Sequence, residues 1–293
     1  MNRNEMSSTA ANRQRTRVWR VMDYIERHLD SKLSVTQLGL IAHLSKYHFH
    51  RQLSAHVGVS ASKLIQLLRL KRASRSLVFS DAVSITNIAL DSGFANAESF
   101  TRAFKQAFGQ SPSAFRRHPQ WTQWRAQYAF IARVNAQRGC MSSVEIVDFP
   151  ETKVAALEHR GAAADTYNTT RRFIEWRRAN GVLPATSRTY GIHYTREDAP
   201  PSEYRLDICA SVESDVLPNP QGVVTKVIPK LRCARMRHLG SRENVACAAY
   251  LYNEWLPTSG ESLGDYPFIF HYVNVGPDVR DHDMITDVYL PLK

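Results

Sequence analysis

Two short segments in the first half of the chain carry the side chains best suited to contact another molecule. In each segment, four residues stand at positions i, i+3, i+4 and i+7, which share one face of a helix. These residues are Tyr47, His50, Arg51 and Ser54 in the first segment, and Glu98, Thr101, Arg102 and Lys105 in the second. Such faces can meet both base edges and phosphates, as a helix in the major groove of double-stranded DNA requires.

The two arginines are the best candidates for reading a base sequence. Arg51 and Arg102 can each donate two hydrogen bonds to guanine, whereas Lys46 and Lys105 are better suited to phosphates. The alternative is a solvated helix face, which two matching faces make a weaker explanation. The full set of expected DNA contacts is Lys46, Tyr47, His50, Arg51, Asn96, Ala97, Glu98, Thr101, Arg102 and Lys105.

Each of these faces belongs to the second of two short helices. Ser34 and Gln37 form a capping box that begins a first helix. In a later copy Gly93 supplies the turn, because glycine adopts positive φ without a Cβ clash. Superposing Phe49 on Phe100 aligns the two copies with a shift of 51 residues. The repeat predicts two helix-turn-helix units. Their reading helices are expected at residues 45–54 and 96–108.

The net charge of +11 lies wholly in the first half of the chain. Residues 1–139 carry a formal charge of +14, and residues 140–293 carry −3. Each lysine or arginine placed against a phosphate releases condensed counterions. A half this basic is therefore suited to bind a polyanion.

The second half contains another duplication. Landmark residues recur with a shift of 79, or of 80 near the end of each copy. The pairs are Pro150 and Pro229, His159 and His238, Gly161 and Gly240, Trp176 and Trp255, and Asp207 and Asp287. Each copy is expected to form two strands, a helix and two more strands. The first copy predicts strands at 144–149, 153–158, 189–194 and 204–211 and a helix at 167–178. The fold class is thus a multidomain protein, with an all-α double helix-turn-helix domain followed by an α+β domain with pseudo-twofold symmetry.

The motifs of the first half resemble the AraC/XylS family of transcription regulators. They are Ser45-Lys46-Tyr47-His48-Phe49-His50-Arg51, Arg69-Leu70-Lys71-Arg72-Ala73, Ile88-Ala89, Gly93-Phe94, Phe100-Thr101-Arg102-Ala103-Phe104-Lys105 and Phe108-Gly109-Gln110-Ser111-Pro112. The resemblance implies a rigid helix around 62–79 that holds the two reading helices in successive major grooves. It also implies RNA polymerase as a partner and activation rather than repression. Gly39 and Leu53 depart from the family's usual Ala and Phe, and a helical glycine costs about 1 kcal/mol, so the first unit is expected to be the looser one.

Residues 144–293 resemble the effector-binding domain of the DNA gyrase-inhibitor-like family. In that fold a small aromatic or amphipathic effector lies in a groove between the copies, lined by aromatic side chains. The resemblance places there Trp176, Tyr190, Glu254, Trp255, Phe270, His271 and Tyr272. His271 stands where many members have a glutamate, so recognition of a cationic ligand does not carry over. Either Glu254 or Glu175 substitutes for it, or a neutral His271 favours an uncharged or anionic ligand.

These patterns divide the chain into four parts. They are a flexible basic N-terminus at 1–17, a DNA-binding domain at 18–117, a linker helix at 118–143 and an effector-binding domain at 144–293. The stripe of Trp121, Trp124, Tyr128 and Ile131, which stand at helical spacing, is expected to pack between the domains. No apolar run is long enough for a membrane helix and no secretory signal is evident, so a cytoplasmic location is expected. The four cysteines have the pattern of free core thiols, and no cofactor or metal site is expected.

Two other functions remain open for the second half. Some members of the gyrase-inhibitor-like group resemble hydrolases of reactive compounds, and Glu254 and His271 would then be the acid and base. Alternatively, the domain binds only another protein, and the chain is a constitutive DNA binder. A chain that senses a small molecule and is not an enzyme is the preferred interpretation, because no nucleophile triad or phosphate-binding glycine loop is present.

Overall fold

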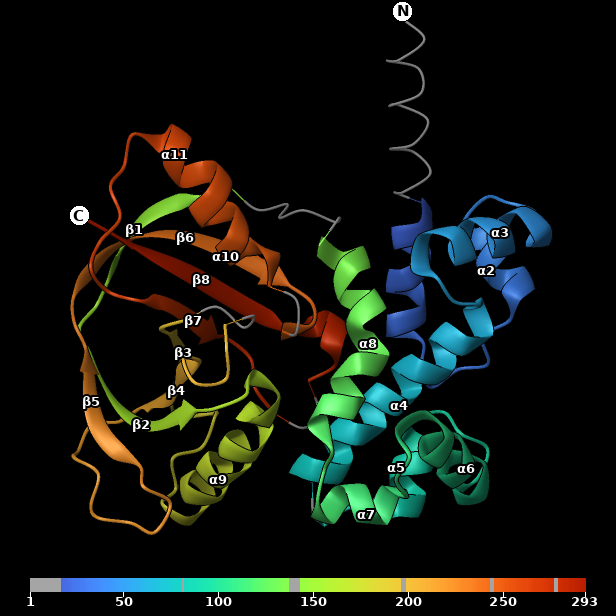
Figure 1. Ribbon diagram of the computed structural model, residues 1–293, viewed down its shortest axis with the longest axis horizontal. Coiled ribbons are helices and arrows are strands. Elements are labelled where there is room, and N and C mark those ends of the chain that lie inside the picture. Colours follow the sequence, from blue (N-terminus) through green and yellow to red (C-terminus); the bar gives the residue numbers. More distant parts are fainter. Residues whose placement is uncertain (1–16, 81, 137–142, 196–198, 243–244, 277–278) are drawn as a thin grey trace, which may run out of the picture. The chain divides into compact units, whose positions relative to one another are not determined.

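The chain folds into two compact units, residues 1–138 and 139–293. The computed structural model describes residues 17–293 except 81, 137–142, 196–198, 243–244 and 277–278 (Figure 1). The expected flexible N-terminus and the end of the expected linker therefore lie outside the described residues. Each unit has its own core, so the two are described separately below.

The first unit is entirely helical in its described residues. A helix over 17–27 precedes the two helix-turn-helix units, and a long central helix joins them. The other helices are α2 (Val35–Ile41), α3 (Lys46–Val57), α4 (Ala61–Phe79), α5 (Ile85–Asp91), α6 (Ala97–Phe108), α7 (Pro112–Arg117) and α8 (Trp121–Ala136). The expected helix-turn-helix pairs are confirmed as α2 with α3 and α5 with α6.

Serine and asparagine side chains begin these helices. Ser34 and Ser84 accept hydrogen bonds from Gln37 N and Asn87 N, both at 3.1 Å. Asn96 accepts from Ser99 N at 2.8 Å. Each cap satisfies a backbone N–H that has no partner within the helix, which is why the element boundaries could be read from the sequence.

The turns of the two units have the same backbone geometry but different residues. His43 and Gly93 both adopt positive φ, at 55° and 82°. His43 N donates to Leu40 O at 3.0 Å, and Gly93 N donates to Leu90 O at 2.9 Å. Positive φ costs a residue with a Cβ about 1 to 2 kcal/mol, so the first turn is the more strained one.

The departure at Gly39 has a packing reason. A Cβ there would lie 3.1 Å from Leu44 O, at the point where the turn passes over α2. Glycine therefore permits a close approach rather than simply weakening the helix. Any looseness of the first unit is better assigned to His43 than to Gly39.

Helix α8 completes the core of the first unit. Trp121, Trp124 and Tyr128 are almost fully buried, and the rings of Trp121 and Phe115 lie 5.2 Å apart. The Tyr128 hydroxyl donates to Leu67 O of α4 at 3.0 Å. The expected helix is confirmed over Trp121–Ala136, but its aromatic stripe packs on α4, α6 and α7 and is not left free for packing between domains. Within the first unit these side chains meet an aromatic cluster, and burial of apolar area against it stabilises the core.

The second unit repeats one strand-strand-helix-strand-strand pattern. The first copy contains β1 (Glu145–Phe149), β2 (Thr152–Arg160), η1 (Ala163–Asp165), α9 (Thr166–Ala179), β3 (Thr189–His193) and β4 (Arg205–Ser211). The second contains β5 (Val224–Ile228), β6 (Leu231–Leu239), α10 (Ala246–Tyr250), η3 (Leu251–Trp255), α11 (Leu256–Ser259), β7 (Phe268–Tyr272), η4 (Asp281–Asp283) and β8 (Ile285–Leu292). The predicted strands and helix of the first copy are confirmed to within a few residues.

All eight strands form one antiparallel sheet, in the order β1-β6-β8-β7-β3-β4-β2-β5. The copies exchange their outer strands, because β1 pairs with β6 and β5 pairs with β2. At the centre, β3 pairs with β7, and Gly191 lies opposite Phe270, its equivalent in the repeat. The pseudo-twofold axis therefore passes between these two residues, as the duplication in the sequence predicts.

The two faces of the sheet bury different residues. On one face α9 covers the first copy through Phe173 and Trp176, and α10 with η3 covers the second through Cys247 and Leu251. On the other face a single apolar cluster joins residues from all eight strands, and its described members lie in strands or in loops between them. The sheet is strongly curled (Figure 1), and the cluster contains Phe149 and Ile228 from its two outer strands.

The helix of the second copy contains a π-helical turn over Leu251–Trp255. Its buried positions Cys247 and Leu251 follow Thr169 and Phe173 by 78 residues, whereas Trp255 follows Trp176 by 79. One extra residue in the second helix is thus absorbed as a π turn, which helices often carry at functional sites. Tyr252, Asn253 and Glu254 are exposed on this turn.

The cysteines depart in part from expectation. Cys209 and Cys233 are free and buried, as expected. Cys247 is disulfide-bonded, so the expectation of a free thiol is wrong for this residue. Cysteine spacing reports sequence distance, whereas a disulfide depends on which thiols the fold brings together.

Candidate functional site

The two reading faces are built on buried phenylalanines. Phe100, Phe104 and Phe108 of α6 pack inward, and Phe104 meets Phe108 at 4.6 Å between ring centroids. Phe49 and Leu53 occupy the equivalent buried positions of α3. Because one side of each helix is fixed in the core, the opposite side must face outward.

The predicted DNA-contacting side chains lie on these outward sides. Tyr47 is 81% exposed, and Arg51 and Arg102 are also exposed. Thr101 and Ala97 are only partly exposed. The remaining members of the predicted set, which are all exposed, are Lys46, His50, Asn96, Glu98 and Lys105.

Two of these residues have partners within α6. Asn96 uses its side-chain oxygen to cap the helix, so the structure gives it a local role beside any contact with DNA. The carboxylate of Glu98 accepts a hydrogen bond from Nη2 of Arg102 at 2.8 Å. This ion pair is exposed, and its residues are one helical turn apart.

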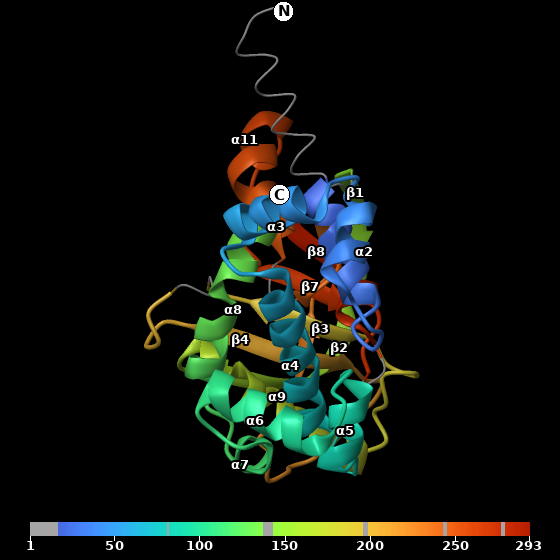
Figure 2. The same ribbon diagram turned by 90° about the vertical axis from the view of Figure 1, so that its right-hand side faces the viewer.

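Helix α4 sets the spacing of the two reading helices. Its 19 residues correspond to a length of roughly 28 Å, close to the ~34 Å helical repeat of DNA. Helices α3 and α6 lie near opposite ends of α4, on the same side of the first unit, as the two views show (Figures 1 and 2). This arrangement is compatible with two successive major grooves.

Arg69 of α4 binds the segment after the first helix, against which the second turn packs closely. Arg69 Nε donates to Leu29 O at 2.8 Å, and Arg69 Nη2 donates to Ser31 O at 2.8 Å. A Cβ on Gly93 would lie 2.4 Å from Leu29 O. The second turn therefore needs glycine for space as well as for its positive φ.

The predicted effector residues do not share one face of the second unit. Phe270 and Tyr272 lie on the helix-covered face with Trp255. Tyr190 and His271 lie on the opposite face, where their rings are 5.0 Å apart. Neighbouring residues of β7 alternate between faces, so the full predicted set cannot line one groove. The predicted acid-base pair Glu254 and His271 is separated by the sheet for the same reason.

A cavity of about 910 Å³ lies where β3 begins and where β4 and β7 end. Trp176 and His271 are the two predicted effector residues that line it. The segments 151–153, 180–188 and 211–217 supply most of its other walls. Arg188 belongs to this lining and was missed by the sequence reasoning, because it stands in a loop without periodicity. The volume is in the range that accepts a small organic molecule.

The charge state of His271 follows from its surroundings. Burial lowers the pKa of His271 from its ordinary value of 6.5, an effect that Asp287 opposes and that Arg188 and Arg237 strengthen. The imidazole is thus neutral at physiological pH. A neutral ring can donate one hydrogen bond and accept another, so it does not require a charged ligand.

A second histidine lies at the pseudo-twofold axis on the helix-covered face. The His193 ring is 4.1 Å from that of Phe270, and its Nε2 is 3.4 Å from the Tyr272 hydroxyl. Burial lowers the pKa of His193 to about 4. Sequence reasoning missed His193, although a shift of 79 pairs it with the selected Tyr272 and could have found it.

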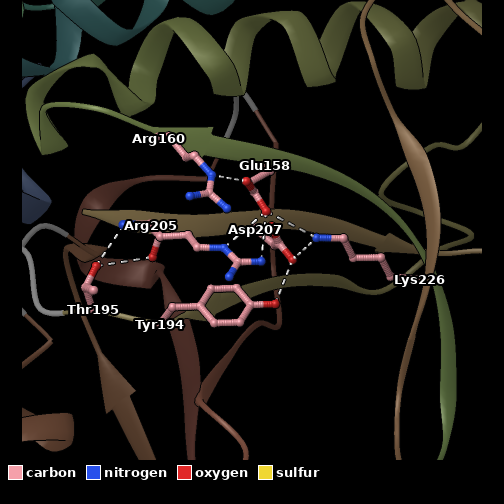
Figure 3. Close-up of polar contacts among 7 residues, drawn as sticks. All are labelled: Glu158, Arg160, Tyr194, Thr195, Arg205, Asp207 and Lys226. Atoms are coloured by element: carbon pink, nitrogen blue, oxygen red, sulfur yellow. Dashed lines mark hydrogen bonds and ion pairs between the residues drawn. The ribbon is translucent and has the colours of Figure 1, made fainter. Parts of the chain in front are cut away.

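A polar network crosses β2, β4 and β5 on the face opposite α9 (Figure 3). The buried Asp207 accepts from Lys226 Nζ at 2.6 Å and from the Tyr194 hydroxyl at 3.0 Å. Glu158 binds Arg205 at 2.9 Å and also binds Arg160, whose hydrogen bond lowers the pKa of this carboxyl group. The network neutralises carboxylates that the sheet buries, as a folded domain requires.

The second copy keeps the buried aspartate but changes its partner. Asp287 accepts two hydrogen bonds from Arg237, at 2.6 and 2.8 Å. Each of the landmark residues Asp207 and Asp287 therefore forms a structural ion pair with a basic side chain on the same face of the sheet. We find no reason to place either carboxylate among effector contacts.

Two twin helix-turn-helix units followed by a duplicated ligand-binding fold define a DNA-binding transcription regulator with a small-molecule-binding domain. The chain belongs to the family of the GyrI-like small molecule binding domain, whose model matches residues 142–293. A helix-turn-helix domain model of the AraC type matches residues 38–118.

Similar proteins cover the two parts separately. The probable transcriptional regulator YgiV of Escherichia coli (strain K12) is 35% identical over 155 residues, which are 51% of this chain and 95% of that protein. The Right origin-binding protein of the same strain is 35% identical over 99 residues, 34% of each protein. The solved structure of an EcmrR-DNA complex in EcmrR-RPo covers 88% of this chain and 98% of its own, with 13% identity and a TM-score of 0.44.

Two findings bear on other classes of site. Within the described ranges, no three or more His, Cys, Asp or Glu side chains are grouped to hold a metal ion. Of the helices that the structure describes, none has the combination of length and apolarity needed to cross a bilayer.

Proposed function

We propose that this regulator activates transcription from promoters whose successive major grooves are read by α3 and α6, in response to a small molecule bound by the second unit. The observation that carries the proposal is the pair of outward arginines, Arg51 and Arg102, at equivalent positions of twin helices on one side of the first unit. The strong positive charge of residues 1–139 supports it. Its DNA target and RNA polymerase would both be met in the cytoplasm.

The DNA-reading part is tested by selecting bound sequences from a random duplex pool. Arg51→Ala and Arg102→Ala should each cost about 1 to 3 kcal/mol of specific binding and relax the preference at one base position. The matched control is Arg117→Ala, which removes the same charge from an exposed position outside both reading helices. If either reading-helix variant kept the affinity and base preference of the unaltered protein, its role would be rejected.

For the effector, we propose the cavity lined by Trp176, Arg188 and His271. The indole of Trp176 and the neutral imidazole of His271 favour an aromatic molecule, and Arg188 offers a partner for an acidic group on it. The same lining also carries Lys153 and the carboxylates of Glu151, Glu213 and Asp215. The second candidate is the aromatic group Trp255, Phe270 and Tyr272 on the other face, which the resemblance in the sequence favours.

Substitutions at His271 and Tyr272, which are adjacent in β7, distinguish the two candidate effector sites. In a thermal-shift screen of aromatic acids, a ligand at 100 times its Kd should stabilise the protein by about 2.7 kcal/mol. His271→Ala should abolish the shift if the cavity is the site, and Tyr272→Phe should leave it unchanged. The reverse result would move the effector to the helix-covered face. A protein stabilised by none of the compounds, but captured by a protein partner, would favour the interaction-module alternative.

We propose no reaction for this protein. The two residues that a hydrolase would use, Glu254 and His271, lie on opposite sides of the sheet, which argues against their acting on one substrate. Turnover of an electrophilic ester by the protein, lost on His271→Ala, would overturn this assignment.

A further inference from the structure

Among the positions at which the two reading helices differ, one in the first turn carries a negative charge in α6 only. The shift of 51 residues that aligns Arg51 with Arg102 also aligns Tyr47 with Glu98. Helix α6 therefore has a carboxylate in its first turn, and α3 has an aromatic ring there. The first turn of a reading helix is the part that enters the major groove most deeply.

Glu98 and Arg102 form an exposed ion pair on α6. Glu98 Oε1 and Arg102 Nη2 are 2.8 Å apart, while the two side chains stay 82% and 78% exposed. An exposed pair of this kind contributes little to stability. Its effect is to direct the guanidinium along the helix toward Glu98. No ion pair is found for Arg51 among the residues that the structure describes.

A carboxylate in the major groove is selective because most of that surface repels it. Phosphates, guanine N7 and O6 and thymine O4 are negative or hydrogen-bond acceptors. Cytosine N4 is a donor without an adjacent acceptor on the same edge, whereas the amino group of adenine stands beside acceptor N7. Of the four bases, cytosine is thus the one that fits an unprotonated glutamate best.

We infer that Glu98 is a specificity-determining residue, and that the half-site read by α6 contains a cytosine beside the guanine read by Arg102. The glutamate accepts from cytosine N4 while its neighbour donates to the adjacent guanine. The half-site read by α3 has no such cytosine requirement. This inference rests on the proposed reading of DNA by α6.

The test is sequence selection from a random duplex pool with the full chain and three variants. Glu98→Gln should lose about tenfold in preference for cytosine at one position and keep the neighbouring guanine. Arg102→Ala should lose the guanine preference. Asp91→Asn is the control, since it removes one exposed carboxylate of the same unit from outside the reading helices and should keep both preferences.

A second readout separates base recognition from a general charge effect. On duplexes without the selected motif, Glu98→Gln should bind more tightly than the unaltered protein, because a repulsion from phosphates is removed. A retained cytosine preference in Glu98→Gln, or the same loss in Asp91→Asn, would overturn the inference while leaving the reading role of Arg102 intact. A pool from which the unaltered protein selects no motif would instead reject the proposed function itself.

Discussion

At the scale of single residues, backbone position decides what a side chain can do. His43 and Gly93 occupy equivalent turns with positive φ, yet only glycine does so without strain. His271 and Tyr272 are adjacent in sequence, yet β pleating sends them to opposite faces of the sheet. Residue type alone is therefore a weak guide to which side chains meet.

The two turns predict opposite effects of substitution. His43→Gly should stabilise the first unit by about 0.5 to 1 kcal/mol, since it relieves positive φ at an exposed position. Gly93→Ala should destabilise the same unit by roughly 2 kcal/mol or more, because its Cβ would lie 2.4 Å from Leu29 O. The free energy of unfolding of both variants is measured by urea denaturation and by the hydrogen exchange of α4 amides. If both substitutions changed the free energy of unfolding equally and in the same direction, the backbone strain assigned to His43 would be refuted.

His193 predicts acid lability of the second unit. Its pKa is about 4 in the folded protein and 6.5 ordinarily, so the unfolded chain binds the proton more readily. The stability from this group is complete above pH 6.5 and declines as the pH falls toward 4, by up to about 3 kcal/mol. Hydrogen exchange of β3 amides measures this loss, and His193→Gln should flatten it. The exchange of α4 should be identical in the variant and the unaltered protein, and a difference there would contradict the local origin.

At the scale of elements, capping and core contacts position the reading helices. α6 begins at a capping asparagine, ends at Gly109 in the left-handed conformation, and is anchored by buried phenylalanines between these points. α8 adds an aromatic layer to the same core. The exposed faces are thus placed by residues that never touch a ligand.

The cap of α6 gives an element-scale prediction. Asn96→Ala should destabilise the first unit by about 0.5 to 2 kcal/mol, since Ser99 N loses its acceptor. Asn96→Ser should cost much less, because serine caps nearly as well. Thermal unfolding measures stability, and DNA titration shows whether Asn96 also contacts bases. If Asn96→Ser kept the stability of the unaltered protein but changed its base preference, Asn96 would contact DNA directly in addition to capping α6.

At the scale of the whole molecule, the two parts of the chain differ in net charge and each contains an internal repeat. The basic excess belongs to residues 1–139, and the duplicated fold with a charge of −3 belongs to the rest. Internal repetition occurs in both parts: one repeat presents two reading helices, and the other creates a pseudo-twofold axis at Gly191 and Phe270. Each repeat supplies two similar elements, and differences such as Tyr47 against Glu98 make them unequal.

The charge division predicts the salt dependence of DNA binding. The logarithm of affinity should fall linearly with the logarithm of salt concentration, and Lys105→Gln should reduce the slope by about 1 without changing base preference. Lys230→Gln, an exposed lysine of the second unit, is the matched control and should leave the slope unchanged. An equal reduction by both variants would show that the second unit also binds phosphates.

Sequence alone determined the elements, because caps, helical periodicity and repeats are local signals that need no knowledge of distant contacts. Both helix-turn-helix pairs and the strands of the first copy followed from them, and the class of regulator followed from the family motifs that these elements carry. Only the tertiary structure decided that Trp121, Trp124 and Tyr128 fill the first core, that Cys247 forms a disulfide, and that the predicted effector residues divide between two faces. These outcomes depend on which segments, distant in sequence, pack against each other. For the effector residues, the order of the eight strands decides which of them share a face of the sheet.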